Sequence, residues 1–240
     1  MNNNKLDNLA LKKTQTKLLK HHGGNGFRAQ QAILNSYESR HNDEFWRFWN
    51  KQVACHYQVG DGVIDMGAGA GLFVRDCANR YPQSKIIGID AANYMVNGSI
   101  PMPQNAELII DDLNNPTQNL AENSVAMIMA NTVIHELTQP IKMFKTAYKW
   151  LKPNGRFCII EGNRQPLSTA LSKRYTPEQL WGENTSTEAL EQTFQYHFEH
   201  NQYQKEDIEF LLIGSGFKII KSELTHQQRL IRIVVEKPVS

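Results

Sequence analysis

The sequence is short of several features that would decide its class at once. It has only three cysteines in 240 residues, Cys55, Cys77 and Cys158. This odd, widely spaced set favours neither a disulfide framework nor a zinc site, and free thiols suit a reducing compartment. No stretch approaches the ~18 consecutive apolar residues of a membrane span, and the Asn-rich start at Met1 to Asn4 lacks the apolar core of a secretory signal. We therefore expect a cytoplasmic protein that does not cross a membrane.

The chain also lacks a strong excess of charge of one sign. Twenty-six Lys and Arg face 24 Asp and Glu, for a net charge of +2. A dedicated nucleic-acid surface usually shows a large basic excess, so we expect no nucleic-acid partner. Five lysines gather in residues 1–24, which we interpret as a solvated, partly frayed leader that ends in a flexible hinge at His21–Gly26. Nothing in the sequence indicates an oligomeric state.

What the chain does have is a glycine-rich turn after an apolar run. The segment from Val63 to Gly71 reads VIDMGAGAG, with glycines at alternate positions and Asp65 just ahead of them. The run predicts a buried strand, and the glycines predict a tight turn into a helix. Glycines let a ligand lie against bare backbone, and the first turn of the helix offers unpaired N–H groups.

Strands and helices alternate beyond this turn, which predicts an α/β fold with a doubly wound, mostly parallel seven-stranded sheet. The last two strands, joined by a short link at Glu223–Gln227, predict an antiparallel hairpin. The expected strands are Gly62–Met66, Lys85–Asp90, Glu107–Ile110, Val125–Ala130, Arg156–Glu161, Phe217–Ser222 and Gln228–Glu236. The expected helices between them are Leu72–Arg80, Asn93–Asn97, Pro140–Leu151 and Lys205–Ile213, with a turn at Lys152–Gly155.

Two segments stand outside the alternation. Apolar residues recur at helical spacing from Phe27 to Gln52, with a cap at Asn42-Asp43 that predicts two helices. We expect residues 1–54 to form a leader and an N-terminal helical lid over a domain at 55–240. A polar insert with scattered aromatics at 162–203 interrupts that domain.

Polar residues follow four of the predicted strands where the carboxyl ends of a doubly wound sheet meet, which is where ligands bind. Asp65 begins the glycine turn, and Asp90 follows about 20 residues after the last glycine, the spacing of an acid that accepts ribose hydroxyls. Asp112 and Leu113 follow the third strand, where a carboxylate and an apolar side chain suit a purine. Asn131 follows the fourth strand and would approach the middle of the ligand.

This order of motifs resembles the class I S-adenosylmethionine-dependent methyltransferases over residues 55–165. Asp65–Gly71 matches the family pattern D/E-x-G-x-G-x-G, and Trp150–Phe157 and Ser215–Phe217 resemble its segments before the fifth and sixth strands. The family's aromatic–aspartate pair at the start of the fourth strand is replaced by Val125-Ala126. The resemblance implies S-adenosyl-L-methionine as cofactor, bound by Asp65, Met66, Gly67, Ala68, Gly69, Asp90, Ala91, Asp112, Leu113 and Asn131.

A dinucleotide cofactor is the alternative for such a turn. A pyrophosphate would be opposed by Asp65 at the entrance of the turn, whereas a carboxylate there suits the ammonium of a methionyl group. The spacing also departs from the G-x-G-x-x-G of dinucleotide sites, since Leu72 stands where that pattern would continue. The sequence therefore favours S-adenosylmethionine over NAD.

The chemistry of the methyl acceptor is less defined. His135 is a candidate general base and Glu161 a candidate for binding a substrate cation, although His135 could cap a helix and Glu161 could pair with Arg164. Candidate substrate contacts are Tyr37, Arg40, Trp46, Arg164 and Tyr175, with a place in the core as the alternative for Trp46. His197 and His200 have no third ligand at metal-binding spacing, so we expect no metal.

These observations predict a methyltransferase that transfers a methyl group to a small molecule by in-line displacement. Two alternatives stay open. The chain could methylate protein or RNA, or it could bind S-adenosylmethionine and catalyse a reaction other than methyl transfer.

Overall fold

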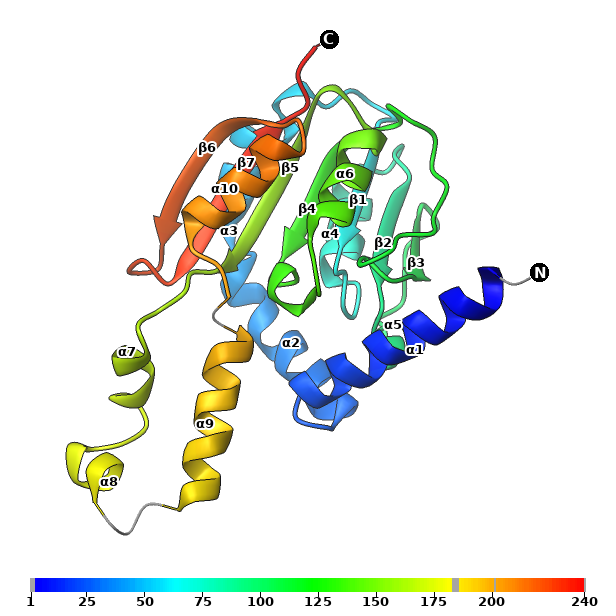
Figure 1. Cartoon of the computed structure of the whole chain (residues 1–240). Helices are drawn as coiled ribbons and strands as arrows, with labels where there is room; N and C mark the ends of the chain where they lie inside the picture. Colours follow the sequence, from blue (N-terminus) through cyan, green and yellow to red (C-terminus); the bar gives the residue numbers. More distant parts are fainter. Residues whose placement is uncertain (1–2, 183–185, 201, 240) are drawn as a thin grey trace.

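The computed structural model describes residues 3–182, 186–200 and 202–239. Met1 and Asn2 of the predicted leader, and residues 183–185 and 201 of the predicted insert, lie outside this part of the chain. Seven strands form one sheet in the order β3-β2-β1-β4-β5-β7-β6 (Figure 1). Their bounds are β1 Gly62–Met66, β2 Ile86–Asp90, β3 Ala106–Ile110, β4 Val125–Asn131, β5 Leu151–Gly162, β6 Lys218–Thr225 and β7 Leu230–Glu236.

The direction of the strands confirms the predicted topology. β1 to β5 are parallel, and β7 runs antiparallel between β5 and β6. The chain moves outward from β1 to β3 and then returns to the other side of β1 to form β4. The carboxyl ends of β1 and β4 therefore flank the point where the strand order reverses, and loops diverge there to leave a crevice.

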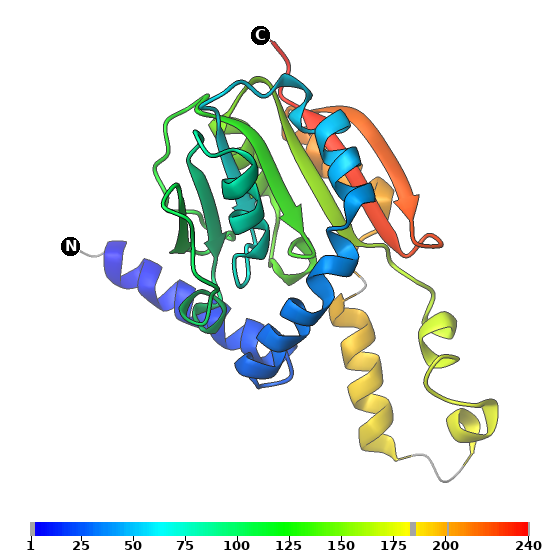
Figure 2. The ribbon, with the colours of Figure 1, turned by 180° about the vertical axis from the view of Figure 1, so that it is seen from behind.

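Helices cover both faces of the sheet. α6 (Ile141–Trp150) and α10 (Lys205–Gly214) lie on one face, and α3 (Asp43–Gln52) and α4 (Leu72–Arg80) lie on the other (Figures 1 and 2). Each pair buries its apolar side against the β-branched and methionine side chains of the central strands. This burial of apolar area is the main stabilising contribution to the fold.

The N-terminal segment differs from its prediction. The described part of the expected leader is a helix, α1 (Asn3–His21), which lies with α2 (Gly26–Arg40) across the carboxyl ends of the parallel strands (Figure 1). Leu18 is only 5% exposed and packs with residues of the loop after β2 and of α5 (Asn93–Asn97). The leader prediction is wrong because contacts with distant segments, which the local pattern does not encode, hold this lysine-rich helix in place.

The junctions on either side of α2 agree with their predictions. Gly23 and Gly24 adopt left-handed backbone angles in the predicted hinge. The side chain of Asn42 accepts a hydrogen bond of 3.1 Å from the backbone N–H of Phe45 and caps α3. The predicted turn at Lys152–Gly155, by contrast, lies within β5, where pairing with β4 is irregular and Asn154 has a φ of 64°.

The predicted insert forms an arm that projects from the sheet (Figures 1 and 2). It contains α7 (Leu167–Leu171), α8 (Pro177–Trp181) and α9 (Thr187–His200), and α9 returns toward the short helix η2 (Ile134–Glu136) after β4. A second short helix, η1 (Ala54–His56), precedes β1. Within the described residues, no helix has the length and apolar character needed to cross a membrane.

An aromatic cluster joins α3 to α4. Trp49 is fully buried and donates a hydrogen bond of 3.0 Å to the hydroxyl of Tyr81, and Trp46 stacks on Phe73 with ring centroids 5.7 Å apart. The cluster fastens the N-terminal helices to the sheet, so its integrity controls the stability of the lid as well as of the core.

We expect Trp49→Ala to lower the free energy of unfolding by about 3–5 kcal/mol, because it removes a buried aromatic side chain and leaves a cavity. Trp181→Ala is the matched control, since Trp181 is 81% exposed on the arm, and it should change that free energy by about 0.5 kcal/mol or less. Urea denaturation measures both. Equal stability of the two variants would contradict the packing described here.

Candidate functional site

A cavity lies at the carboxyl ends of β1, β2 and β4, beneath α2. We call it the central cavity. It is lined by His22, Ile33, Tyr37, Arg40, His41, Asp65, Gly67, Ala68, Gly69, Leu72, Phe73, Asp90, Ala92, Met95, Met129, Asn131, Thr132, Val133 and Glu136. Most of the predicted cofactor residues are in this set. Met66 is not, because its side chain is fully buried in the core.

The glycine turn gives the central cavity a floor of bare backbone. Gly67, Gly69 and Gly71 all have positive φ. A Cβ on Gly67 would lie 2.7 Å from Cβ of Val133, so no side chain fits there. At Gly69 the nearest atom to such a Cβ would be Cδ1 of Ile33 at 3.7 Å, across the cavity. The first glycine permits close packing, and the second leaves room for a ligand.

Asp90 ties this turn to the next loop. Its Oδ2 accepts a hydrogen bond of 2.7 Å from the backbone N–H of Gly69, and its Oδ1 accepts one of 2.7 Å from the N–H of Ala92. Burial raises the pKa of Asp90 to about 6, although these two N–H groups oppose the shift. Each oxygen keeps a further lone pair, so the carboxylate can accept hydroxyl groups from a ligand.

Asp65 is buried beside the turn and has no hydrogen-bond or ion-pair partner among the described residues. It is 4% exposed, and burial together with the nearby charge of Asp90 raises its pKa to about 8. An unpartnered buried carboxylate is costly when ionised. A cationic group in the central cavity would remove that cost, and this observation fits a ligand with an ammonium group.

The loop after β3 closes one end of the site. A small space of about 20 Å³ lies between Asp112, Leu113, Ala91 and the α1 residues Thr14 and Leu18, and we call it the narrow cavity. Asp112 accepts hydrogen bonds from the Thr14 hydroxyl at 2.7 Å and from Asn114. The space has room for about one water molecule, so α1 occupies the place predicted for a purine.

The neighbouring Asp111 has a structural role. Its carboxylate accepts hydrogen bonds from the backbone N–H groups of Asp112, Thr117 and Gln118 and from the hydroxyl of Thr117. These four donors occupy it fully. Of the two acids, Asp112 is therefore the one available to a ligand.

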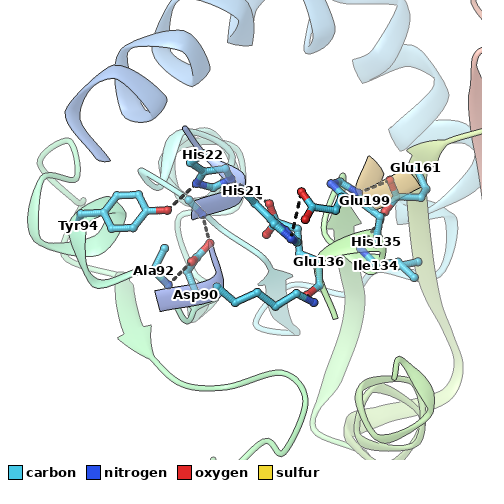
Figure 3. Close-up of polar contacts among 12 residues, drawn as sticks. His21, His22, Asp90, Ala92, Tyr94, Ile134, His135, Glu136, Glu161 and Glu199 are labelled. Carbon is cyan, nitrogen blue, oxygen red and sulfur yellow. Dashed lines mark hydrogen bonds and ion pairs between the residues drawn. The ribbon is translucent and has the colours of Figure 1, made fainter. Parts of the chain in front are cut away.

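A hydrogen-bonded pair that was not among the predicted site residues, His22 and Glu136, lines the central cavity. Nε2 of His22, in the hinge after α1, lies 2.9 Å from Oε1 of Glu136, and its Nδ1 is hydrogen-bonded to the hydroxyl of Tyr94 (Figure 3). Burial disfavours the charged form of Glu136, but His22 outweighs it and the pKa of Glu136 is lowered. His22 follows a segment predicted to be frayed, so no local signal pointed to it.

The predicted catalytic residues contact each other and do not line any of the cavities described here. Nδ1 of His135 lies 2.8 Å from Oε1 of Glu161, whose other oxygen accepts the N–H groups of Ile134 and His135 (Figure 3). Burial opposes the imidazolium, but Glu161 outweighs it, so the pKa of His135 is raised. These contacts fix η2 against β5.

Further histidines pack around this pair. The ring of His200, at the end of α9, lies 5.2 Å from the ring of His135 and 5.5 Å from that of His21 on α1. The arm, η2 and the N-terminal helix therefore meet at one point. Among the described residues, no group of three or more His, Cys, Asp or Glu side chains is placed to hold a metal ion.

The predicted substrate residues separate into two groups. Tyr37 and Arg40 line the central cavity, as expected for a lid. Trp46, Arg164 and Tyr175 lie elsewhere, so the structure does not support them as cavity contacts. Trp46 belongs to the aromatic core, Arg164 pairs with Asp207 at 3.8 Å, and Tyr175 is hydrogen-bonded to Thr193 within the arm.

A second cavity of about 380 Å³, the side cavity, adjoins the first. It lies between α2–α3 and the β6–β7 turn and shares Arg40, Asn131 and Thr132 with the central cavity. Its other lining residues are Ser39, Asn42, Glu44, Phe45, Ile160, Thr225, His226, Leu230 and Arg232. Thr132 has a φ of 53°, so the shared wall contains a strained backbone position of the kind that gathers at binding sites.

Comparison with known proteins assigns the family. The model of the family described as "Methyltransferase domain" matches residues 58–211, which include the glycine turn, Asp90, Asp112, Asn131 and Thr132. The chain belongs to this family. It is a class I S-adenosylmethionine-dependent methyltransferase, and its cofactor is S-adenosylmethionine.

Individual relatives are more distant. A malonyl-[acyl-carrier protein] O-methyltransferase of Halalkalibacterium halodurans is 27% identical over 97 residues, which are 39% of this chain and 36% of that protein. Phosphoethanolamine N-methyltransferase 1 of Triticum aestivum is 29% identical over 112 residues, 45% of this chain and 22% of that protein. The chain thus matches well under half the length of either relative.

A solved structure agrees on the fold. Phosphoethanolamine N-methyltransferase 2 of Haemonchus contortus, in complex with S-adenosyl-L-methionine, superposes with a TM-score of 0.62 at 14% identity, covering 88% of this chain and 58% of that one. The residues here fit such a cofactor, since the central cavity offers bare glycine backbone, an acid for hydroxyls and an unpartnered buried carboxylate for a cation.

We expect the affinity for S-adenosylhomocysteine, which keeps the ammonium group, to rise roughly tenfold per pH unit from pH 6.5 to 7.5 and to level off above pH 8. With its pKa at about 8, Asp65 is protonated below that pH in the free protein, and binding of a cation must release the proton. Calorimetry in buffers of different ionisation enthalpy measures both the affinity and the released proton.

Asp65→Asn should bind more weakly at pH 8 and lose this pH dependence. Asp43→Asn, at an exposed position on α3, is the matched control and should retain it. Binding to the unaltered chain without proton release at pH 7 would contradict the assignment of Asp65 as the group that meets the cation.

Proposed function

We propose that this methyltransferase acts on a small molecule that binds in the side cavity. The observation that carries the proposal is the shared wall of Arg40, Asn131 and Thr132 between the two cavities. The side cavity, at about 380 Å³, has the size of a small-ligand pocket. An acceptor bound in the side cavity would lie next to a cofactor bound in the central cavity.

Methyl transfer by in-line displacement depends mainly on position. When bound, S-adenosylmethionine supplies an electrophilic methyl group on a cationic sulfur. The residues of the chain would bind and orient it: Asp65 would meet the ammonium, Asp90 would accept hydroxyl groups, and Asp112 with Leu113 would hold the purine. Asn131 and Thr132 lie between the two cavities and set the approach of the acceptor. Holding two reactants in this way contributes a large part of such a rate enhancement.

His135 and Glu161 have a positioning role in this proposal. Glu161 accepts two backbone N–H groups of η2 and the His135 ring, so the pair fixes the segment that follows the shared wall. Catalysis by His135 as a general base stays a prediction, and its contacts favour positioning. Glu136 and His22 face the cavity instead.

One curated relative supports a small acceptor by its name, which specifies phosphoethanolamine, whereas the name of the other specifies a malonyl group on a carrier protein. Protein or RNA methylation is the less favoured alternative, because the side cavity suits a compact ligand. The three cysteines are free, which suits the cytoplasmic location that we propose.

The activity test is transfer of a radioactive methyl group from S-adenosylmethionine to an extract separated into small-molecule, protein and RNA fractions. We expect label in the small-molecule fraction, and its loss in Asp65→Asn. Label confined to protein or RNA would contradict the proposal.

We further propose that residues 1–54 are a lid whose first helix, α1, must move to admit the cofactor. The Thr14 hydroxyl donates a hydrogen bond to Asp112, and Leu18 lines the narrow cavity beside it, which has a volume of about 20 Å³. His22 fastens the end of α1 to Glu136 and Tyr94. These contacts close the end of the site where we expect the purine.

We expect Thr14→Val to bind S-adenosylhomocysteine about threefold or more tightly, because it removes a hydrogen bond to a charged group, worth about 1.5 kcal/mol or less after exchange with water, that competes with the purine. Thr16→Val is the control, since Thr16 is exposed on the same helix and bonds only to the Lys12 carbonyl. Calorimetry measures the affinities. If Thr14→Val bound S-adenosylhomocysteine more weakly and Thr16→Val did not, the proposed movement would be contradicted, because α1 would then be a fixed wall of the binding site.

A further inference from the structure

We infer that the methyl acceptor carries an anionic group, a carboxylate or a phosphate, on an apolar body, and that Arg232 and Arg40 bind this group in the side cavity. The inference rests on the proposed function, because it assigns the chemistry of the molecule that the side cavity receives.

Arg232 on β7 is held in place with part of its guanidinium unused. Its Nε donates a hydrogen bond of 2.7 Å to Glu223, its Nη2 pairs with the same oxygen at 2.7 Å, and the group lies 4.0 Å from the ring centroid of Phe48. Nη1 is 3.8 Å from Glu44, beyond hydrogen-bond distance, and bonds to no other described residue. A fixed guanidinium with free N–H groups loses little entropy when it binds an anion.

Arg40 supplies a second guanidinium to the same cavity. Its hydrogen bonds go to the carbonyl and hydroxyl of Ser36, one turn earlier on α2, and no carboxylate of a described residue pairs with it. Glu44 is the one acidic residue in the lining of the side cavity, and its side chain is 70% exposed. Glu223 balances the charge of Arg232 from outside the lining, whereas Arg40 is left without an acidic partner among the described residues. An anionic ligand in the side cavity would supply that partner and could also accept from the free Nη1 of Arg232.

The remaining walls define the rest of the ligand. Phe45, Ile160 and Leu230 offer apolar surface between the two arginines and the β6–β7 turn. His226, in that turn, has a φ of 51°, and the next two residues also have positive φ. Strain of this kind persists where the surrounding structure enforces it, and here it holds His226 at the rim of the cavity.

The position of Arg232 allows binding of the acceptor to be distinguished from binding of the cofactor. Arg40 lines both cavities, so it can also meet the carboxylate of the methionyl group. Arg232 lines only the side cavity. A loss of affinity in Arg232 variants that leaves S-adenosylhomocysteine binding unchanged therefore reports on the acceptor alone.

The test uses four probes with the same chain and different head groups: hexanoate, hexyl phosphate, hexan-1-ol and hexylamine. Each is titrated by calorimetry into the full-length protein saturated with S-adenosylhomocysteine. We expect hexanoate or hexyl phosphate, whichever head group the site prefers, to bind with one-to-one stoichiometry and at least about tenfold more tightly than the alcohol and the amine.

Arg232→Gln should weaken binding of the preferred anion about tenfold or more, and Arg232→Lys, which keeps the charge, should weaken it less. Arg229→Gln is the matched control, since Arg229 is exposed in the same hairpin and outside the cavity lining. Arg40→Gln should also weaken binding of the preferred anion. Its control is Arg28→Gln, at an exposed position on the same helix. Unchanged S-adenosylhomocysteine affinity in the Arg232 variants shows that the fold is retained.

Equal binding of hexan-1-ol and the preferred anion, failure of both anions to bind, or unchanged anion affinity in Arg232→Gln would overturn the inference. The proposed function fails separately. Labelled methyl transfer to an uncharged small molecule removes only the anionic class, whereas transfer confined to protein or RNA removes the small-molecule function itself.

Discussion

The carboxylates of Asp65, which is buried, and Asp90, which is partly buried, lie at the carboxyl ends of two adjacent parallel strands, and no described residue forms an ion pair with either. Asp90 satisfies part of its hydrogen-bonding capacity with the N–H groups of Gly69 and Ala92, and in doing so it fixes the glycine turn. Asp65 has no such compensation, and burial keeps it protonated to about pH 8. A cation in the central cavity, as the methionyl ammonium would be, would compensate the ionised carboxylate of Asp65.

The N-terminal helices of the structure cover this site. Apolar burial by α3 and α4 fastens the N-terminal segment to the sheet, and α1 and α2 then extend across the strand ends. A closed site excludes water and strengthens electrostatic interactions, but a helix that lies on Asp112 also blocks the purine end. In the proposed opening of the lid, the hinge between α1 and α2 would let α1 move while α2 and α3 stay in place.

The sequence predicted the sheet well because its signals are local. Short β-branched runs, glycine turns and caps such as Asn42 are encoded within a few residues, and the ends of β1 and α4 fall where the pattern placed them. The places of the three candidate cofactor acids followed from the same signals, since Asp65 and Asp90 lie at the carboxyl ends of β1 and β2 and Asp112 comes shortly after β3. Their contacts with the cofactor stay a prediction. The family's fixed order of motifs supplied the cofactor itself, and the match to the methyltransferase family confirmed it.

The predictions failed for residues whose positions are determined by tertiary contacts. α1 carries many lysines and has no strong apolar face, so its packing through Leu18 and Thr14 could not be inferred from local pattern. Trp46 was one of several aromatics at helical spacing, and only the fold shows that it faces α4 and not the ligand. Arg232 was not predicted as a site residue, because it is a single charged residue in an apolar strand. Its position near α2 and α3 depends on the pairing of β7 with β5.

The most direct test of the central claim is a crystal structure of the complex with S-adenosylhomocysteine. We predict that the amino-acid end lies against Asp65, the purine lies on Leu113 beside Asp112 with α1 displaced, and the side cavity stays open next to the sulfur. A complex in which the ligand fills the side cavity, or in which Thr14 still bonds Asp112 while the purine lies elsewhere, would contradict it.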